Sequence, residues 1–107
     1  MRTTRAAYFA ALSFVDYNAG RILARLEEEG ELENTLVIYT SDHGEFLGEY
    51  GCWGKRSMLD PAARVPLLVR YPERFAAGQK VTKVASAVDV LPTCLEAAGL
   101  RIPSDRS

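Results

Sequence analysis

The residues of this chain that are best suited to chemistry lie in two short polar stretches. The first holds Asp42 and His43 side by side, followed directly by Gly44. A carboxylate is a hard oxygen ligand and an imidazole a borderline nitrogen ligand, so such a pair can hold a divalent cation. Gly44 would let the chain turn sharply and bring both side chains to one ion. A structural histidine, hydrogen-bonded within the turn, is the alternative that the spacing leaves open.

Lys55 is the candidate in the second stretch, twelve positions after His43. A lysine among glycines and small polar residues can present a compact positive charge to an oxyanion. Arg56 is the rival anion-binding side chain, and a solvated surface lysine is the alternative without function. Arg64 and Arg70 flank a later apolar segment, where we expect them to form ion pairs or to extend along a sheet edge.

Apolar segments on either side of these stretches predict the strands that position them. Residues 36–40 are apolar and β-branched without alternation, which favours a strand buried on both faces, as in a parallel sheet covered by helices. Residues 65–71 predict a second such strand, and residues 81–85 a short third one. In open α/β sheets, ligands gather beyond the carboxyl ends of strands, which is where Asp42 stands. Residues 41–64 form a glycine-punctuated loop whose length is typical of a functional segment.

Helices are predicted at both ends of the chain. Apolar positions recur at steps of three and four over residues 4–29, which predicts a long amphipathic helix that ends at Gly30. Asp89 is a typical N-cap, and the helix that it starts should end at Gly99. The alternation of helices and strands predicts an α/β fold. The predicted helices are too few to cover both faces of a parallel sheet. We therefore expect that the chain is part of a larger sheet or associates with another copy of itself.

The overall composition narrows the class of protein. The chain has 107 residues, 48% of them hydrophobic, and a net charge of -1, so it is neither a disordered tail nor an electrostatic binder of nucleic acids. No apolar run is long enough for a membrane span, and the first residues do not form a signal segment. Cys52 and Cys94 are too few for a disulfide framework or a zinc knuckle, and a single disulfide between them stays open. Cys94 is predicted to lie in the core.

Four sequence strings occur along the chain in a recognisable order: residues 34–51 read NTLVIYTSDHGEFLGEYG, residues 53–55 read WGK, residues 64–67 read RVPL and residues 88–93 read VDVLPT. In content, order and spacing these strings resemble the motifs of the sulfatase family of the alkaline-phosphatase-like superfamily. The resemblance covers nearly the whole chain. The resemblance implies an alkaline-phosphatase-like α/β sandwich with a mostly parallel sheet between helices. Residues 1–107 would be the C-terminal portion of its catalytic domain.

The resemblance also implies roles for the candidate residues. Asp42 and His43 would be two ligands of the active-site cation, with calcium expected first and manganese or magnesium open. Lys55 would be catalytic and would bind the sulfate group of a sulfate ester, either a small molecule or a glycan. The family's nucleophile is a formylglycine made from Cys or Ser in a C/S-x-P-S-R motif, and this chain contains no such motif. Cys52 has an arginine at the right interval but Gly and Lys inside it, so we do not assign it as the nucleophile.

Three interpretations therefore remain. The first is a sulfuric ester hydrolase of which this chain is a part, inactive by itself because the nucleophile and half of the cation ligands are missing. The second is a phosphonate monoester or phosphodiester hydrolase of the same superfamily, favoured by the Asp60-Pro61 pair. The third is a folded segment without catalysis that acts in assembly through an exposed sheet or helix surface. Members of the family are often periplasmic or extracellular, but no signal segment is visible here.

Overall fold

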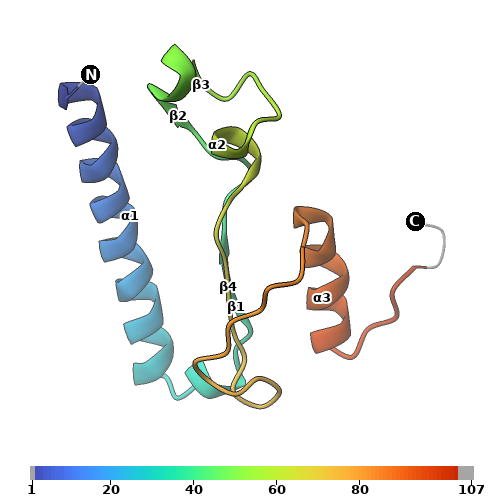
Figure 1. The fold of residues 1–107 in the computed structure, drawn as a ribbon. Helices are drawn as coiled ribbons and strands as arrows, with labels where there is room; N and C mark the ends of the chain where they lie inside the picture. The colour runs from blue at the N-terminus through green and yellow to red at the C-terminus, as the bar shows by residue number, and fades with distance from the viewer. Residues whose placement is uncertain (1, 104–107) are drawn as a thin grey trace.

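The computed structural model describes residues 2–103 and arranges them as helices around two small sheets (Figure 1). In chain order these are α1 (Arg2–Glu28), β1 (Val37–Thr40), β2 (Phe46–Leu47), β3 (Trp53–Gly54), α2 (Asp60–Ala63), β4 (Leu67–Arg70) and α3 (Val90–Ala97). Short 3-10 turns precede β1, β3 and α3, at Leu32–Asn34, Glu49–Gly51 and Ala87–Asp89. Figure 1 shows α1 and α3 on opposite sides of the β1–β4 pair.

The first helix ends where local sequence signals place its end. Gly30 has a φ of 73°, the left-handed conformation that glycine adopts without a Cβ penalty. The N–H of Glu31 donates to the carbonyl of Leu26 at 2.9 Å, and the N–H of Gly30 donates to that of Glu27 at 3.0 Å. These bonds satisfy carbonyls of the last turn, so the predicted helix and its end are confirmed.

The larger sheet is an antiparallel pair of β1 and β4, with Val37 opposite Arg70 and Thr40 opposite Leu67. Arg70 forms an ion pair with Glu33 and donates a hydrogen bond to the carbonyl of Leu32 at 2.7 Å, as predicted for a structural arginine. Within residues 2–103, helices and small antiparallel sheets agree with an α/β composition, whereas no parallel strand pair is present. The chain leaves β1 and re-enters β4 at the same end of this sheet.

The prediction of a third strand at residues 81–85 is wrong. This segment has no strand conformation, and Val81 and Val84 are 74% and 101% exposed. β-branched residues form a strand only when a neighbouring strand completes their hydrogen bonds and their packing. Neither is provided to this segment by the described part of the chain.

Little of the apolar surface is buried. Phe46, Ala62 and Tyr71 are the buried hydrophobic residues, whereas Tyr39 and Leu68 of the β1–β4 sheet are 40% and 63% exposed. The accessible surface is 9114 Å², where a compact protein of 11.8 kDa would expose about 5,900 Å². The radius of gyration is 16.9 Å, against about 13 Å for a compact chain of this length. The strands are therefore not buried on both faces, because these residues alone do not cover them.

A capping box precedes the last helix, at the 3-10 turn Ala87–Asp89, with Ser86 as its N-cap. The N–H of Ser86 donates to Oδ2 of Asp89 at 2.8 Å. Asp89 stands at the predicted N-cap position of α3, but its side chain forms no cap hydrogen bond to that helix, because it is used by the turn before it. The helix ends at Gly99 with a φ of 70°, as predicted. Cys94 is exposed and not in the core, because no residue of the described range 2–103 covers its side of α3. Cys52 is also exposed, and both are free thiols. None of the helices within residues 2–103 is long and apolar enough to span a membrane.

Candidate functional site

The turn after β1 is organised by hydrogen bonds among its own residues. The hydroxyl of Ser41 donates to the carbonyl of His43 at 2.7 Å, and the N–H of His43 donates to Oδ1 of Asp42 at 3.0 Å. Short polar side chains commonly stabilise turns in this way. The turn holds the carboxylate of Asp42 and the imidazole of His43 on one side of the strand end.

The imidazole of His43 is oriented by its other neighbours. Its Nδ1 lies 2.8 Å from the carbonyl oxygen of Gly44, which can only accept, so Nδ1 carries the proton in this tautomer. Nε2 then presents its lone pair to Oδ2 of Asp42 at 3.4 Å. Nε2 of His43 and Oδ2 of Asp42 are then both hydrogen-bond acceptors with no proton between them. A positively charged group beside these two atoms is therefore favoured.

Lys55 supplies such a charge. Its ammonium group donates a hydrogen bond to Nε2 of His43. The β2–β3 hairpin makes this contact possible, because it pairs Phe46 with Gly54 and returns the chain towards His43. Phe46 is 1% exposed and anchors the hairpin. The structure thus brings the three predicted site residues together, whereas Arg56 makes no such contact with His43.

Gly44 is required for a reason that differs from the predicted one. Its φ is not in the left-handed region, so the turn itself does not demand glycine. Instead, its N–H donates to the carbonyl of Ala62 in α2 at 2.7 Å, and a Cβ atom at Gly44 would lie 2.0 Å from the carbonyl oxygen of Pro61. The absence of a side chain lets α2 approach the strand end. It also places Pro61 beside the site.

Sequence reasoning missed Glu45. Its Oε1 accepts a hydrogen bond from the N–H of Gly54 at 2.7 Å, in a partly buried position directly before Lys55. The sequence around Glu45 does not indicate this hydrogen bond, because the donor is a backbone N–H group nine residues away. The glycine at position 54 is the one sequence feature that points to an unusual backbone there.

The pKa is lowered for Asp42 at the site and for Glu49, which lies outside the site at the far end of the hairpin. Desolvation, the largest single influence, raises the pKa of Asp42. The imidazole of His43, two backbone N–H groups and Lys55 together outweigh it and lower that pKa below its usual value. Hydrogen bonds from the backbone N–H groups of Glu49 and Leu47 likewise lower the pKa of Glu49. Asp42 is therefore an anion at neutral pH, as a cation ligand must be.

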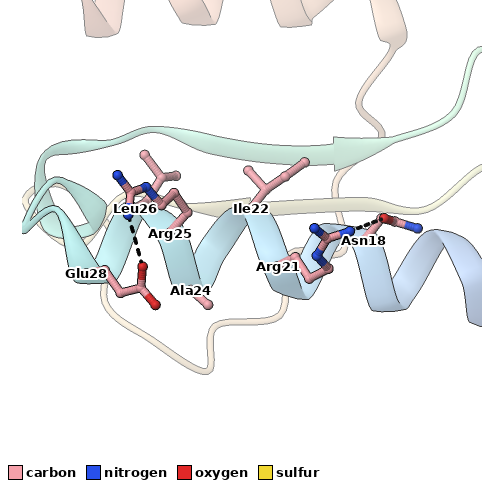
Figure 2. Close-up of a pocket in the computed structure, with 7 residues that line it drawn as sticks. All are labelled: Asn18, Arg21, Ile22, Ala24, Arg25, Leu26 and Glu28. Carbon is pink, nitrogen blue, oxygen red and sulfur yellow. Dashed lines mark hydrogen bonds and ion pairs between the residues drawn. The ribbon is translucent and has the colours of Figure 1, made fainter.

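The surface of the described part of the chain includes two hollows of some size. One of about 420 Å³ separates α1 from the strand ends and is lined by residues that include Tyr8, His43, Glu45 and Arg64. The other, of about 690 Å³, is lined by residues of α1 alone (Figure 2). In this second hollow Arg25 pairs with Glu28 at 3.3 Å and the other lining residues offer no converging chemistry. The first hollow is therefore the one that reaches the candidate site, through His43.

Two side chains of the site, Asp42 and His43, have donor atoms that could bind a metal ion. Within residues 2–103, no three His, Cys, Asp or Glu side chains converge as a metal-binding group. Asp42 and His43 therefore need further ligands from elsewhere to complete a coordination shell. Their chemistry, one hard oxygen and one borderline nitrogen, is compatible with calcium, manganese or magnesium.

Comparisons with known proteins agree on one family. The sequence profile described as Sulfatase matches residues 2–100. The chain is 47% identical over 98 residues to an N-acetylglucosamine-6-O-sulfatase of Bacteroides thetaiotaomicron, covering 92% of this chain and 18% of that protein. It is 40% identical over 107 residues to Arylsulfatase K of Xenopus laevis and 37% over 106 residues to a Choline-sulfatase of Rhizobium meliloti, covering 100% and 99% of this chain and 20% of each relative.

A solved structure agrees with these relatives. It describes a protein in complex with its substrate D-glucosamine-2-N,6-O-disulfate, and it superposes with a TM-score of 0.82 at 48% identity. The superposition covers 85% of this chain and 18% of that one. The chain thus spans about a fifth of the length of the proteins that it matches. The match over residues 2–100, in sequence and in backbone, shows that the chain belongs to the sulfatase family.

Proposed function

We propose that residues 1–107 are one segment of a sulfuric ester hydrolase, and that they supply two cation ligands and a sulfate-binding lysine to its active site. The observation that carries this proposal is the convergence of Asp42, His43 and Lys55 beyond the end of β1. The nucleophile and the remaining ligands would come from other parts of a longer chain, within a mostly parallel sheet between helices. The large accessible surface of these residues supports the presence of further segments that would cover it.

Asp42 and His43 are the residues that would hold the cation. When bound, a divalent cation would neutralise negative charge on the sulfuryl oxygens. Oδ2 of Asp42 and Nε2 of His43 lie 3.4 Å apart, so both atoms could bind one ion. The bond from Nδ1 of His43 to the carbonyl of Gly44 keeps the Nε2 lone pair directed at this point.

Lys55 would bind the sulfate group. A sulfate monoester carries its charge on three peripheral oxygens, and an ammonium group fixed beside the cation can bind one of them throughout the reaction. In the structure the ammonium group of Lys55 contacts His43, so the side chain is long enough to bind a sulfate oxygen next to the proposed cation. The substrate would be a sulfated small molecule or glycan, as the sulfated sugar bound to the similar solved structure suggests.

If Asp42 and His43 bind the cation, replacement of either residue should strongly weaken cation binding. In the intact protein, Asp42→Ala or His43→Ala should weaken calcium or manganese binding by at least about 100-fold, because even residues that only support a metal ligand contribute about 10–100-fold. Isothermal titration calorimetry measures this change. Asp16→Asn, which removes a carboxylate from α1, is the matched control and should leave the affinity unchanged. Equal affinities of all four proteins would exclude this cation site.

The 107-residue chain by itself should show no turnover of aryl sulfates with added calcium, because it lacks a nucleophile and completes only part of the cation site. Its affinity for manganese should be in the millimolar range. His43 is the only histidine of the chain, so paramagnetic broadening of its imidazole resonances reports this binding without ambiguity. Turnover by this chain, or micromolar manganese binding that His43→Ala abolishes, would contradict the prediction.

The reaction itself is tested by parallel assays of the intact protein on an aryl sulfate, an aryl phosphonate monoester and a diaryl phosphodiester. Preference for the sulfate ester supports the proposal. Preference for either phosphorus ester would instead favour the hydrolases suggested by the Asp60-Pro61 pair, of which Pro61 lies beside Gly44. Turnover of none of them would leave a segment without catalysis.

A further inference from the structure

We propose that Glu45 is a positioning residue for Lys55: through the N–H of Gly54 it fixes the direction in which Lys55 leaves the β2–β3 hairpin. This inference rests on the proposed function, because it assumes the sulfate-binding role of Lys55. It assigns a task to a carboxylate that neither the motif spacing nor the cation site explains.

The bond between Glu45 and Gly54 is the first observation. Oε1 of Glu45 accepts the Gly54 N–H at 2.7 Å in a partly buried position. Hydrogen bonds to an ionised acceptor are roughly twice as strong as neutral ones, and partial exclusion of water strengthens them further. The peptide plane before Gly54 is therefore held by a side chain as well as by the sheet ladder.

The conformation of Gly54 is the second observation. Its φ is +84°, and glycine samples positive and negative φ about equally, so the residue before Lys55 is intrinsically free to redirect the chain. β2 and β3 are only two residues long each, and Phe46 opposite Gly54 is their sole buried member. A ladder this short leaves the exit of the hairpin weakly determined unless a further bond holds it.

The chain path connects this bond to the site. Glu45 lies two residues after His43, and Gly54 lies directly before Lys55. The hydrogen bond between Glu45 and Gly54 therefore closes a loop in the chain. His43 lies just before this loop and Lys55 just after it, and their side chains contact each other. Loss of the bond would let these ends separate without any change in the groups themselves.

Glu49 provides a matched comparison in the same hairpin. Its carboxylate also accepts a backbone N–H, that of Leu47, at 2.5 Å. Its bond lies at the opposite end of the hairpin, near Arg5, whose side chain donates to the carbonyl of Leu47 at 2.6 Å. Removal of Glu49 thus costs a similar hydrogen bond without reaching Lys55.

The test uses the intact, cation-loaded protein and an aryl sulfate. Glu45→Ala should lower kcat by about 10–100-fold, because a displacement of about 1 Å of a catalytic group has effects of that order. Glu45→Gln keeps an oxygen acceptor and should restore kcat to within about 3-fold of the parent protein. Glu45→Asp keeps the charge but withdraws the oxygen by one methylene, so it should lower kcat as the alanine variant does. This variant carries the test if Glu45→Ala does not fold.

A double-mutant cycle separates positioning from a general loss of structure. In a Lys55→Ala background, Glu45→Ala should change kcat by less than about 2-fold, since the group that it positions is gone. Glu49→Ala should leave kcat within about 2-fold in either background. A full effect of Glu45→Ala in the Lys55→Ala background, or no rescue by Glu45→Gln, would overturn the inference.

The two levels of the proposal fail differently. If Lys55→Ala itself leaves kcat unchanged, the role of Lys55 in the proposed function is wrong and the inference is overturned with it. If Lys55→Ala lowers kcat but Glu45→Ala and Glu45→Asp do not, the proposed function stands and only the positioning role is wrong.

Discussion

Replacement of Lys55 by alanine in the intact protein is expected to lower kcat on an aryl sulfate by about 10²–10³-fold. This is the range seen when a preorganised group that stabilises transition-state charge is removed. The physical reason is local: Lys55 is held beside His43 and contributes to the low pKa of Asp42, so its charge lies next to the two proposed cation ligands. Most of the loss should appear in kcat and less in KM.

Lys80→Ala is the matched control for this prediction. Lys80 is exposed in the segment between β4 and α3, and its removal subtracts the same charge from the chain. Steady-state kinetics should show unchanged kcat for this variant. Lys55→Arg should recover only part of the activity, because a planar guanidinium does not occupy the position of a compact ammonium group. Equal kinetics for Lys55→Ala and Lys80→Ala would contradict the role assigned to Lys55.

The second large effect should come from Gly44→Ala. The added Cβ would lie 2.0 Å from the carbonyl oxygen of Pro61, a backbone atom that cannot rotate away. Either α2 moves from the strand end or the turn that holds Asp42 and His43 moves, and both break the bond from the Gly44 N–H to Ala62. We expect a loss of about 3 kcal/mol in the free energy of unfolding, the upper part of the usual cost of overpacking.

Gly20→Ala is the matched glycine control, and its expected sign is opposite. Gly20 lies inside α1 with open space where a Cβ would stand. Alanine should therefore stabilise the helix by about 0.5–1 kcal/mol. Chemical denaturation of the intact protein measures both changes, and kcat should fall only for Gly44→Ala. Comparable stability of the two variants would show that α2 does not approach Gly44 as closely as in this structure.

Features with local causes were predictable from the sequence. The end of α1 depends on Gly30 and on bonds to the preceding turn, and the end of α3 depends on Gly99 in the same way. The chemical character of Asp42, His43 and Lys55 follows from residue type, and the spacing of the motifs was sufficient to identify the family.

Features that depend on partners distant in the chain were not predictable. A strand-like run at residues 81–85 remains outside any sheet because no strand is available beside it. The side of α3 that carries Cys94 is exposed because amphipathic patterning states which face can be buried, not whether something covers it. The antiparallel direction of β1 and β4 likewise depends on the path of the long loop between them.

The sequence by itself determined which groups of this sulfatase-family chain can do chemistry and where its helices end, because both depend on residue type and on neighbours within about one turn. Only the tertiary structure decided that Lys55 meets His43, that Gly44 admits α2, and that Glu45 holds Gly54. These contacts join residues that a hairpin or a close backbone approach brings together. Spacing along the chain does not encode such distances, since a short ladder and one buried Phe46 set them in space.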